Sequence, residues 1–135
     1  MKDCRVEATI RLRIGEHDAH YGGGLVAGAK IMEFFGDVAT ELCIRHDGDE
    51  GLFAAYDNVE FKAPTYAGDF LEIKGWITKA GNTSRRMEFE AWRVISSLHD
   101  PENPSAAEIL NEPVLVARAS GTCVVPKAQQ RIPRD

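Results

Sequence analysis

The feature that most constrains the fold is a long segment, Leu25–Ile44, that is apolar almost all the way round. Its charged residues fall on one arc of roughly 80° when a helix is drawn at about 100° per residue: Lys30, Glu33, Asp37 and Glu41. The glycines Gly22–Gly24 precede this helix, and the turn-forming stretch Arg45–Gly51 ends it. A helix with so narrow a polar stripe must be covered on most sides by the rest of the chain.

The remaining segments read as β-strands that can supply this cover. Arg5–Ile14 alternates apolar and polar residues, as is typical of a half-buried antiparallel strand. Further strands are expected at Leu52–Phe61, Phe70–Ala80, Ser84–Ser96 and Val114–Val125, with a bend at Ala63–Asp69, a hairpin turn at Gly81-Asn82 and a polar loop at His99–Pro113. The pattern predicts an α+β domain in which a curved sheet wraps around the helix.

Length and composition narrow the class of protein further. A chain of 135 residues favours a single domain, with residues 1–126 as the ordered core and residues 127–135 as a loose tail. No apolar run approaches the roughly 20 residues that span a bilayer, and the N-terminus lacks the apolar segment of a secretory signal. We therefore expect no membrane partner and a cytoplasmic location.

Charge and cysteine content exclude two further classes of partner. The net charge of −5 comes without a basic block, so nucleic acid is not an expected partner. The cysteines Cys4, Cys43 and Cys123 are odd in number and far apart. They indicate free thiols in a reducing compartment, and no spacing indicates a zinc site.

The polar stripe of the predicted helix has two interpretations. It can be the solvent-facing side of a helix that is otherwise covered. However, Asp37 and Glu41 are like charges at i, i+4. A cleft would disfavour the doubly charged pair, so that one carboxyl group would hold a proton more readily and suit general acid–base catalysis. The stripe alone does not decide between them.

The glycines also have two interpretations. Gly22–Gly24 and Gly28 allow a ligand to approach the backbone closely, and the unpaired N–H groups at a helix start attract an oxyanion or a polarised carbonyl. They can equally form a flexible loop and allow close packing of helix on sheet. His20 and Tyr21 lie beside them as candidate proton carriers or as hydrogen-bonded bystanders.

Several motifs resemble the hotdog-fold acyl-CoA proteins. The bend P-x-x-x-G-D, the strand after it and the turn G-N-T-S are similar to hotdog acyl-CoA thioesterases. The stretches DAHYGG, FGDVATEL, DGDEGLF, YDNVEF and GNTSR are more similar to the ammonia-lyase branch, the β-alanyl-CoA and 3-aminobutyryl-CoA ammonia-lyases of amino-acid fermentation, lysine fermentation included. DNVEF and GNTSR favour the 3-aminobutyryl-CoA enzyme, whereas the insertion His99–Pro113 is more like the β-alanyl-CoA enzyme. The resemblance covers Arg11 to about Val125.

The resemblance implies a hotdog fold and a carbon–nitrogen lyase that converts 3-aminobutyryl-CoA reversibly to crotonyl-CoA and ammonia. It also implies a homodimer with its sheets joined edge to edge and two sites at the interface, assembled further into a hexamer. No metal and no permanently bound cofactor are expected, and coenzyme A enters as part of the acyl-CoA thioester substrate.

The resemblance assigns roles to individual residues. The thioester oxygen is expected at the backbone of Gly28 and Ala29, with Gly24 nearby, and the acid on the helix corresponds to Asp37. Nine residues of helix span roughly 13 Å, so Gly28 of one chain and Asp37 of the other are expected to meet at one substrate. Glu60 is a second candidate acid, with an outward-facing strand residue as its alternative. His20 and Tyr21 would orient the substrate or carry a proton.

The phosphates of coenzyme A are expected at the predicted hairpin turn. Lys79, Arg85 and Arg86 would supply positive charge there, and the turn itself would supply hydrogen bonds from Gly81, Asn82, Thr83 and Ser84. Without the resemblance, the same residues fit the solvated end of a hairpin.

Three alternative functions stay open. A hotdog acyl-CoA thioesterase would use the same contacts to the thioester oxygen, but its carboxylate would activate water or attack the carbonyl. An enoyl-CoA hydratase of related fold carries an Asp-x-x-x-x-His signature that is not obvious here, and a non-catalytic acyl-CoA-binding module would only bind. The sequence does not assign the acyl chain, the direction of reaction, or the protons among Asp37, Glu41 and Glu60.

Overall fold

A computed structural model describes residues 5–133 of the chain. The strands are β1 (Glu7–Arg13), β2 (Leu52–Phe61), β3 (Phe70–Ala80), β4 (Ser84–Ser97) and β5 (Ala107–Val124). The long helix is α1 (Gly28–Asp47), and the short 3₁₀ turns are η1 (Glu16–Asp18), η2 (Gly22–Gly24) and η3 (Lys127–Gln129). None of these helices is long and apolar enough to cross a membrane.

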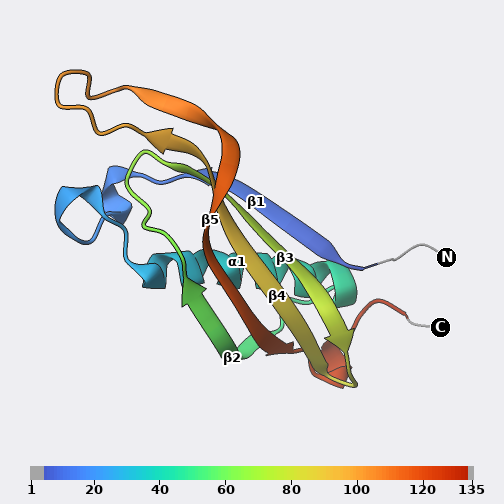
Figure 1. The fold of residues 1–135 in the computed structure, drawn as a ribbon. Coiled ribbons are helices and arrows are strands. Elements are labelled where there is room, and N and C mark those ends of the chain that lie inside the picture. The colour runs from blue at the N-terminus through green and yellow to red at the C-terminus, as the bar shows by residue number, and fades with distance from the viewer. Residues whose placement is uncertain (1–4, 134–135) are drawn as a thin grey trace.

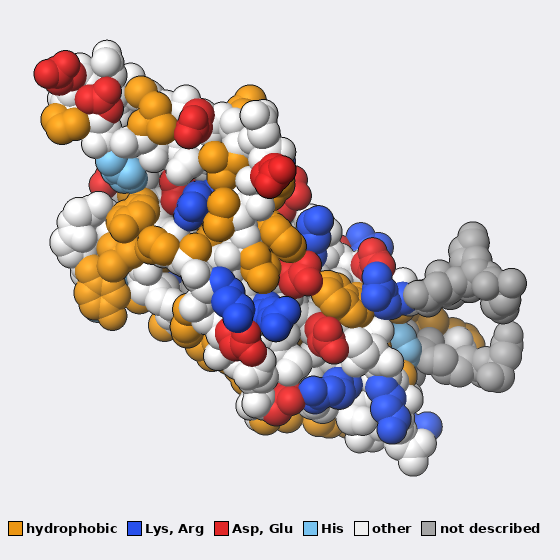
Figure 2. Space-filling model, in the orientation of Figure 1, with side chains coloured by type: hydrophobic (Ala, Val, Ile, Leu, Met, Phe, Trp, Pro, Cys, Tyr) orange, Lys and Arg blue, Asp and Glu red, His pale blue; other side chains and the backbone are white. Residues whose placement is uncertain are grey.

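The five strands form one antiparallel sheet in the order β1-β3-β4-β5-β2, so β1 and β2 are its edges. In Figure 1, α1 runs along one face of this sheet, and the strands cross over it. The other face carries charged side chains of both signs, interspersed over the strands (Figure 2). The α+β hotdog fold predicted from the sequence is confirmed.

The core lies between α1 and the sheet. The buried side chains of α1 include Phe35, Val38 and Leu42, which are 0% exposed. Phe35 stacks on Phe89 of β4 with ring centroids 5.3 Å apart. Gly75 of β3 allows a close approach of α1 to the sheet, because a Cβ at that position would lie 2.7 Å from Val38 Cγ1. The helix is therefore seated on strand backbone as well as on side chains.

The helix starts and ends later than predicted, at Gly28 and Asp47 in place of Leu25 and Ile44. Leu25 and Val26 form isolated β-bridges with Tyr66 and Ala19, and these contacts hold the chain extended up to Ala27. At the other end, Gly48 adopts a left-handed conformation with φ of 75°, and its N–H donates to Ile44 O.

The prediction of a polar loop over His99–Pro113 is wrong for the second half of that range. Strand β5 begins at Ala107, which pairs with Ser97, and Ile109 pairs with Ile95. Pro113 falls where the β4–β5 register shifts, between the pairs Ile95↔Ile109 and Arg93↔Val114, so no regular ladder bond is lost there. The strands thus extend into an arm, residues 94–113, that projects beyond α1 (Figure 1).

The segment after Pro126 differs from a loose tail in its described part. Gln130 Nε2 donates to Asn82 O at 2.8 Å and to Val125 O at 3.0 Å. The N–H of Arg131 donates to Asp47 O at 2.8 Å, at the end of α1. Cys43 and Cys123 are buried free thiols. Cys4 and residues 134–135 lie outside the described residues.

We expect Gly75→Ala to lower the free energy of unfolding by about 1–3 kcal/mol. The added methyl group would lie 2.7 Å from Val38 Cγ1 and 2.9 Å from Phe89 Cδ1, so helix and strand must separate slightly. Denaturant unfolding measures the change. Gly22→Ala is the control, because its Cβ meets no atom within 4 Å, and it should change stability by less than about 0.5 kcal/mol. Equal stability of the two variants would contradict the packing described.

Candidate functional site

Two hollows meet at the start of α1. An apolar hollow of about 460 Å³ is lined by residues of the preceding loop, of α1 and of the end of β2, among them Tyr21, Leu25, Gly28, Ile31 and Phe61. A more polar hollow of about 490 Å³ is lined by His17, Asp18, His20, Tyr21, Ala29, Lys30 and Glu33. Tyr21 borders both hollows, and the first two residues of the helix border one each.

The helix start presents unpaired hydrogen-bond donors to these hollows. The N–H of Lys30 donates to Ala27 O at 3.0 Å, but within residues 5–133 no acceptor is bonded to the N–H groups of Gly28 and Ala29. The Phe61 ring lies against Gly28, where a Cβ would be 2.6 Å from Phe61 Cζ. Glycine is therefore required for this close contact, and the ring covers one side of the donors.

The loop before the helix is held in shape by its own contacts. Gly23 and Gly24 have φ of 74° and 80°, conformations that other residues rarely adopt. The backbone N–H groups of His20 and Tyr21 both donate to Leu25 O at 3.0 Å, and the two rings meet edge to face at 4.7 Å. His20 and Tyr21 are both exposed. The structure thus places His20 and Tyr21 at the hollows beside the helix start, whereas Gly24 lies against Ala67, whose N–H donates to Gly24 O at 2.9 Å.

Ion pairs along α1 set Asp37 apart from the rest of the polar stripe. Lys30 Nζ lies 3.0 Å from Glu33 Oε1, and Arg45 Nε lies 2.7 Å from Glu41 Oε2. Asp37, between these pairs, is exposed and forms no ion pair or side-chain hydrogen bond with the residues that the structure describes. The like-charged neighbour Glu41 is thus paired with Arg45, and the carboxylate of Asp37 has no partner among the described residues.

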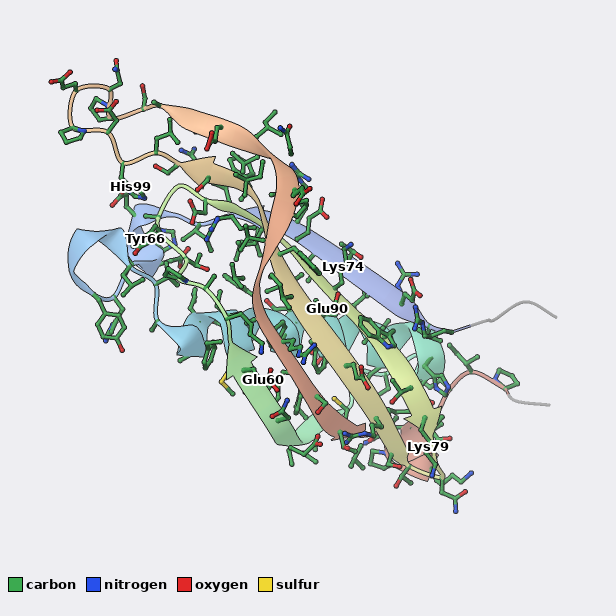
Figure 3. All side chains as sticks on the ribbon, viewed as in Figure 1. Glu60, Tyr66, Lys74, Lys79, Glu90 and His99 are labelled. Atoms are coloured by element: carbon green, nitrogen blue, oxygen red, sulfur yellow. The ribbon has the colours of Figure 1, made fainter. Side chains whose placement is uncertain are left out.

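Glu60 lies elsewhere, near the end of the edge strand β2. It shares a register row with Arg118 and Glu90, on the face of the sheet turned away from α1 (Figure 3). Glu60 Oε1 is 2.8 Å from Lys62 Nζ and 3.3 Å from Arg118 Nε. The hydrogen bond from Lys62, with a further one from Asn58, lowers the pKa of Glu60 to about 2. This carboxyl group is therefore anionic at neutral pH and does not reach the two hollows within one chain.

The predicted coenzyme A turn lies at the far end of the molecule from the helix start. Figure 3 shows Lys79 at one end of the sheet and Tyr66, whose backbone bridges to Leu25, at the other. Lys79, Gly81, Asn82 and Ser84 are exposed, and Thr83 is half-buried. Arg86 is partly exposed and forms a two-point ion pair with Asp57, at 3.0 and 2.8 Å.

The prediction that Arg85 belongs to an exposed basic patch is wrong. Its side chain is 2% exposed and pairs with the fully buried Asp47 through Nε–Oδ2 at 2.8 Å and Nη2–Oδ1 at 2.9 Å. Strand alternation explains this: Arg85 shares the inward face of β4 with Met87 and Phe89, whereas Arg86 faces outward. Arg85 thus has a role inside the fold and offers no exposed charge to a phosphate.

Sequence reasoning missed two contacts that shape the site. Phe61 was expected only as a strand residue, although its ring contacts Gly28. Tyr56 donates from its hydroxyl to Met32 O at 3.0 Å, and burial raises the pKa of Tyr56 to about 12. Both contacts join a residue of β2 to a residue of α1 that is far from it in the sequence, so the pattern of neighbouring residues does not predict them. Within residues 5–133 no group of three or more His, Cys, Asp or Glu side chains is placed to hold a metal ion.

Comparison with known proteins adds the family. The sequence profile of the Thioesterase superfamily matches residues 23–96. The chain is 59% identical over 126 residues to the 3-aminobutyryl-CoA ammonia lyase of Acetoanaerobium sticklandii, covering 93% of this chain and 99% of that protein. An uncharacterized acyl-CoA thioester hydrolase of Zymomonas mobilis is 29% identical over 103 residues, covering 76% of this chain and 68% of that protein.

Solved structures agree with this assignment. The β-alanyl-CoA:ammonia lyase of Clostridium propionicum superposes with a TM-score of 0.90 at 42% sequence identity, covering 96% of this chain and 91% of that chain. A hexameric hotdog fold thioesterase of Campylobacter jejuni, at 19% identity, shares the fold with a TM-score of 0.71, covering 93% of this chain and 88% of that one. The chain therefore belongs to the hotdog-fold thioesterase superfamily, in the family of the 3-aminobutyryl-CoA and β-alanyl-CoA ammonia lyases, as its motifs predict.

Proposed function

We propose that this protein is a carbon–nitrogen lyase that eliminates ammonia from a β-amino acyl-CoA thioester, with 3-aminobutyryl-CoA and crotonyl-CoA as the preferred pair. The observation that carries the proposal is one helix that offers unpaired N–H groups at its start and an unpaired carboxylate at Asp37. The 59% identity to a protein named 3-aminobutyryl-CoA ammonia lyase supports this choice of acyl chain.

In this proposal, the thioester oxygen of the substrate binds at the helix start. Removing a proton from the α-carbon of a thioester builds negative charge on that oxygen, and donors already in place stabilise it. The N–H groups of Gly28 and Ala29 are such donors, and the Phe61 ring limits the access of water on one side. Each donor of this kind contributes about 3–4 kcal/mol to the transition state in enzymes where one has been removed.

The carboxylate comes from a second copy of the chain. Asp37 lies nine residues beyond Gly28, roughly 13 Å along the helix, which is too far for both to contact one thioester. A two-fold dimer brings the helix start of one chain to Asp37 of its partner. The edge strand β2 offers a surface for this dimer, because Leu52 and Phe61 at its two ends are 71% and 53% exposed. Further assembly of dimers into a hexamer stays a prediction.

Asp37 acts as base and then as acid. Its carboxylate takes the α-proton, the electron pair forms the carbon–carbon double bond, and the bond to nitrogen breaks to release ammonia. The protonated Asp37 then gives its proton to ammonia, which leaves as ammonium, and the carboxylate is restored. Glu60, held anionic by Lys62, is the second candidate, and it would bind the substrate ammonium only as a residue of the partner chain, because it lies outside the hollows of its own chain. His20 and Tyr21 border the hollows and would orient the substrate.

Coenzyme A is part of the substrate, and its phosphates meet the β3–β4 turn. Lys79 is exposed there, and Asn82, Thr83 and Ser84 carry polar side chains that can donate hydrogen bonds. Arg86 contributes less charge than its sequence position indicates, because Asp57 already pairs with it. The cytoplasmic location stays a prediction.

The test is to incubate the protein with crotonyl-CoA and ammonium chloride. We expect the enoyl absorbance to fall without release of free thiol, and the reverse reaction of 3-aminobutyryl-CoA to release ammonia. Release of free thiol would identify a thioesterase instead. Acrylyl-CoA assayed in parallel decides between the β-alanyl and 3-aminobutyryl chains.

Asp37→Asn should lower kcat for ammonia release by roughly 10²- to 10⁴-fold, because the amide cannot take the α-proton. Binding of coenzyme A, measured by calorimetry, should be unchanged. Glu41→Gln is the matched control on the same helix face, since Glu41 is paired with Arg45, and its kcat should stay within about twofold of wild type. Full turnover by Asp37→Asn would remove Asp37 from the mechanism.

The carboxyl group of Glu60 should titrate near pH 2, well below its ordinary pKa of 4.5, and so stay anionic from pH 4 upward. Lys62→Ala removes the hydrogen bond that contributes most and should raise the pKa of Glu60 toward 4.5. Carbon-detected NMR titration follows the carboxyl group directly, and Lys79→Ala is the control for loss of a distant lysine. A Glu60 pKa above 4.5 in the wild type would contradict the ion pairing described.

A further inference from the structure

We infer that Asp47, Arg85 and Gln130 are positioning residues for the coenzyme A part of the substrate, because they hold the carbonyl groups of the β3–β4 turn toward the inside of the protein. The turn comprises residues 81–84. This inference rests on the proposed function, in which that turn meets the coenzyme A phosphates.

Every carbonyl oxygen of the turn accepts a hydrogen bond from within the chain. Arg85 Nη1 donates to Gly81 O and to Ser84 O, both at 2.8 Å. Gln130 Nε2 donates to Asn82 O at 2.8 Å. The backbone N–H of Val125 donates to Thr83 O at 2.8 Å. The turn is thus held by Arg85, which follows it directly, and by two residues from a segment far later in the sequence, Val125 just after β5 and Gln130 just after η3.

This arrangement fixes which groups the turn presents to solvent. With its carbonyls engaged, the turn exposes the side chains of Asn82 and Ser84, and the backbone N–H groups of Asn82 and Thr83 have no partner among residues 5–133. A phosphate accepts hydrogen bonds and is repelled by carbonyl oxygens, so a turn that shows donors outward and carbonyls inward favours it. The three residues set this polarity without contacting the ligand.

The buried ion pair links the turn to the helix that carries Asp37. Asp47, the last residue of α1, is 0% exposed, and its carboxylate accepts two hydrogen bonds from Arg85. The carbonyl of Asp47 also accepts from the N–H of Arg131, next to Gln130. Asp37 lies ten residues earlier, roughly 15 Å along the same helix. The ion pair therefore fixes the distance between the turn and the acid.

Arginine is required for this role by its geometry. A guanidinium donates in a fixed plane, so Arg85 reaches both oxygens of Asp47 and two backbone carbonyls at once. A lysine could keep the ion pair but could not hold all four acceptors. Two single variants, Arg85→Lys and Gln130→Ala, therefore loosen the turn in two independent ways. Neither variant leaves a buried charge unpaired.

The experiment measures kcat and KM with 3-aminobutyryl-CoA and with the corresponding pantetheine thioester, which lacks the nucleotide and its phosphates. Gln130→Ala removes the hydrogen bonds to Asn82 O and to Val125 O, of which only the first reaches the turn. It should raise KM for the coenzyme A thioester about five- to tenfold, the effect of one hydrogen bond lost at the turn, with kcat within about twofold. KM for the pantetheine thioester should not change. Gln129→Ala is the matched control, because Gln129 is exposed and its side chain forms no hydrogen bond within the described residues.

Arg85→Lys should give the same selective rise in KM, and calorimetry with free coenzyme A should show the matching loss of affinity. A thermal unfolding curve confirms that each variant is folded. The inference is overturned if both thioesters are affected equally, if Gln130→Ala behaves as Gln129→Ala, or if the wild type does not bind coenzyme A. If calorimetry shows that the wild type binds coenzyme A and that Gln130→Ala and Arg85→Lys bind it more weakly, but no ammonia is released, the proposed function is refuted and the inference is supported.

Discussion

The seating of α1 on the sheet is the constraint from which the remaining features follow. Phe35, Val38 and Leu42 are fully buried, and Gly75 lets the helix approach the β3 backbone closely. Because the helix is fixed along its length, both of its ends have defined surroundings. Its start lies against the Phe61 ring, and its end is joined to β4 by the Asp47–Arg85 ion pair. Because the helix is rigid, it holds its start, at the Phe61 ring, at a fixed distance from its end, at the Asp47–Arg85 ion pair.

The charged residues along α1 differ in whether they have an ion-pair partner. Glu33 pairs with Lys30, which also contacts Asp18, and Glu41 pairs with Arg45, whereas Asp37 has no ion-pair partner in the described part of the chain. An elimination from a thioester needs donors for the developing enolate and a base for the α-proton. One helix supplies both, but at a separation of roughly 13 Å. In the proposed mechanism, two helices from two chains therefore contribute to each site.

Much of the fold could be predicted because its local patterns agree with its long-range packing. The alternation in Glu7–Arg13 and the narrow polar stripe of α1 each indicate an element that the structure contains. The errors arise where distant contacts override local preference. Leu25 has a helical neighbourhood but bridges to Tyr66, and the segment Ala107–Pro113 has turn-forming residues but pairs with β4. Arg85 looked like a phosphate contact because the sequence does not show that Asp47 lies opposite it.

The measurement that tests the shared site most directly is activity after co-expression of two inactive variants. Asp37→Asn lacks the carboxylate, and Gly28→Val places a side chain where the Phe61 ring lies, since a Cβ there would be 2.6 Å from the ring. In a mixed dimer one of the two sites combines an intact helix start with an intact Asp37. Random pairing then predicts recovery of about a quarter of wild-type activity. No recovery, with mixed dimers present, would show that each site belongs to a single chain and would contradict the account.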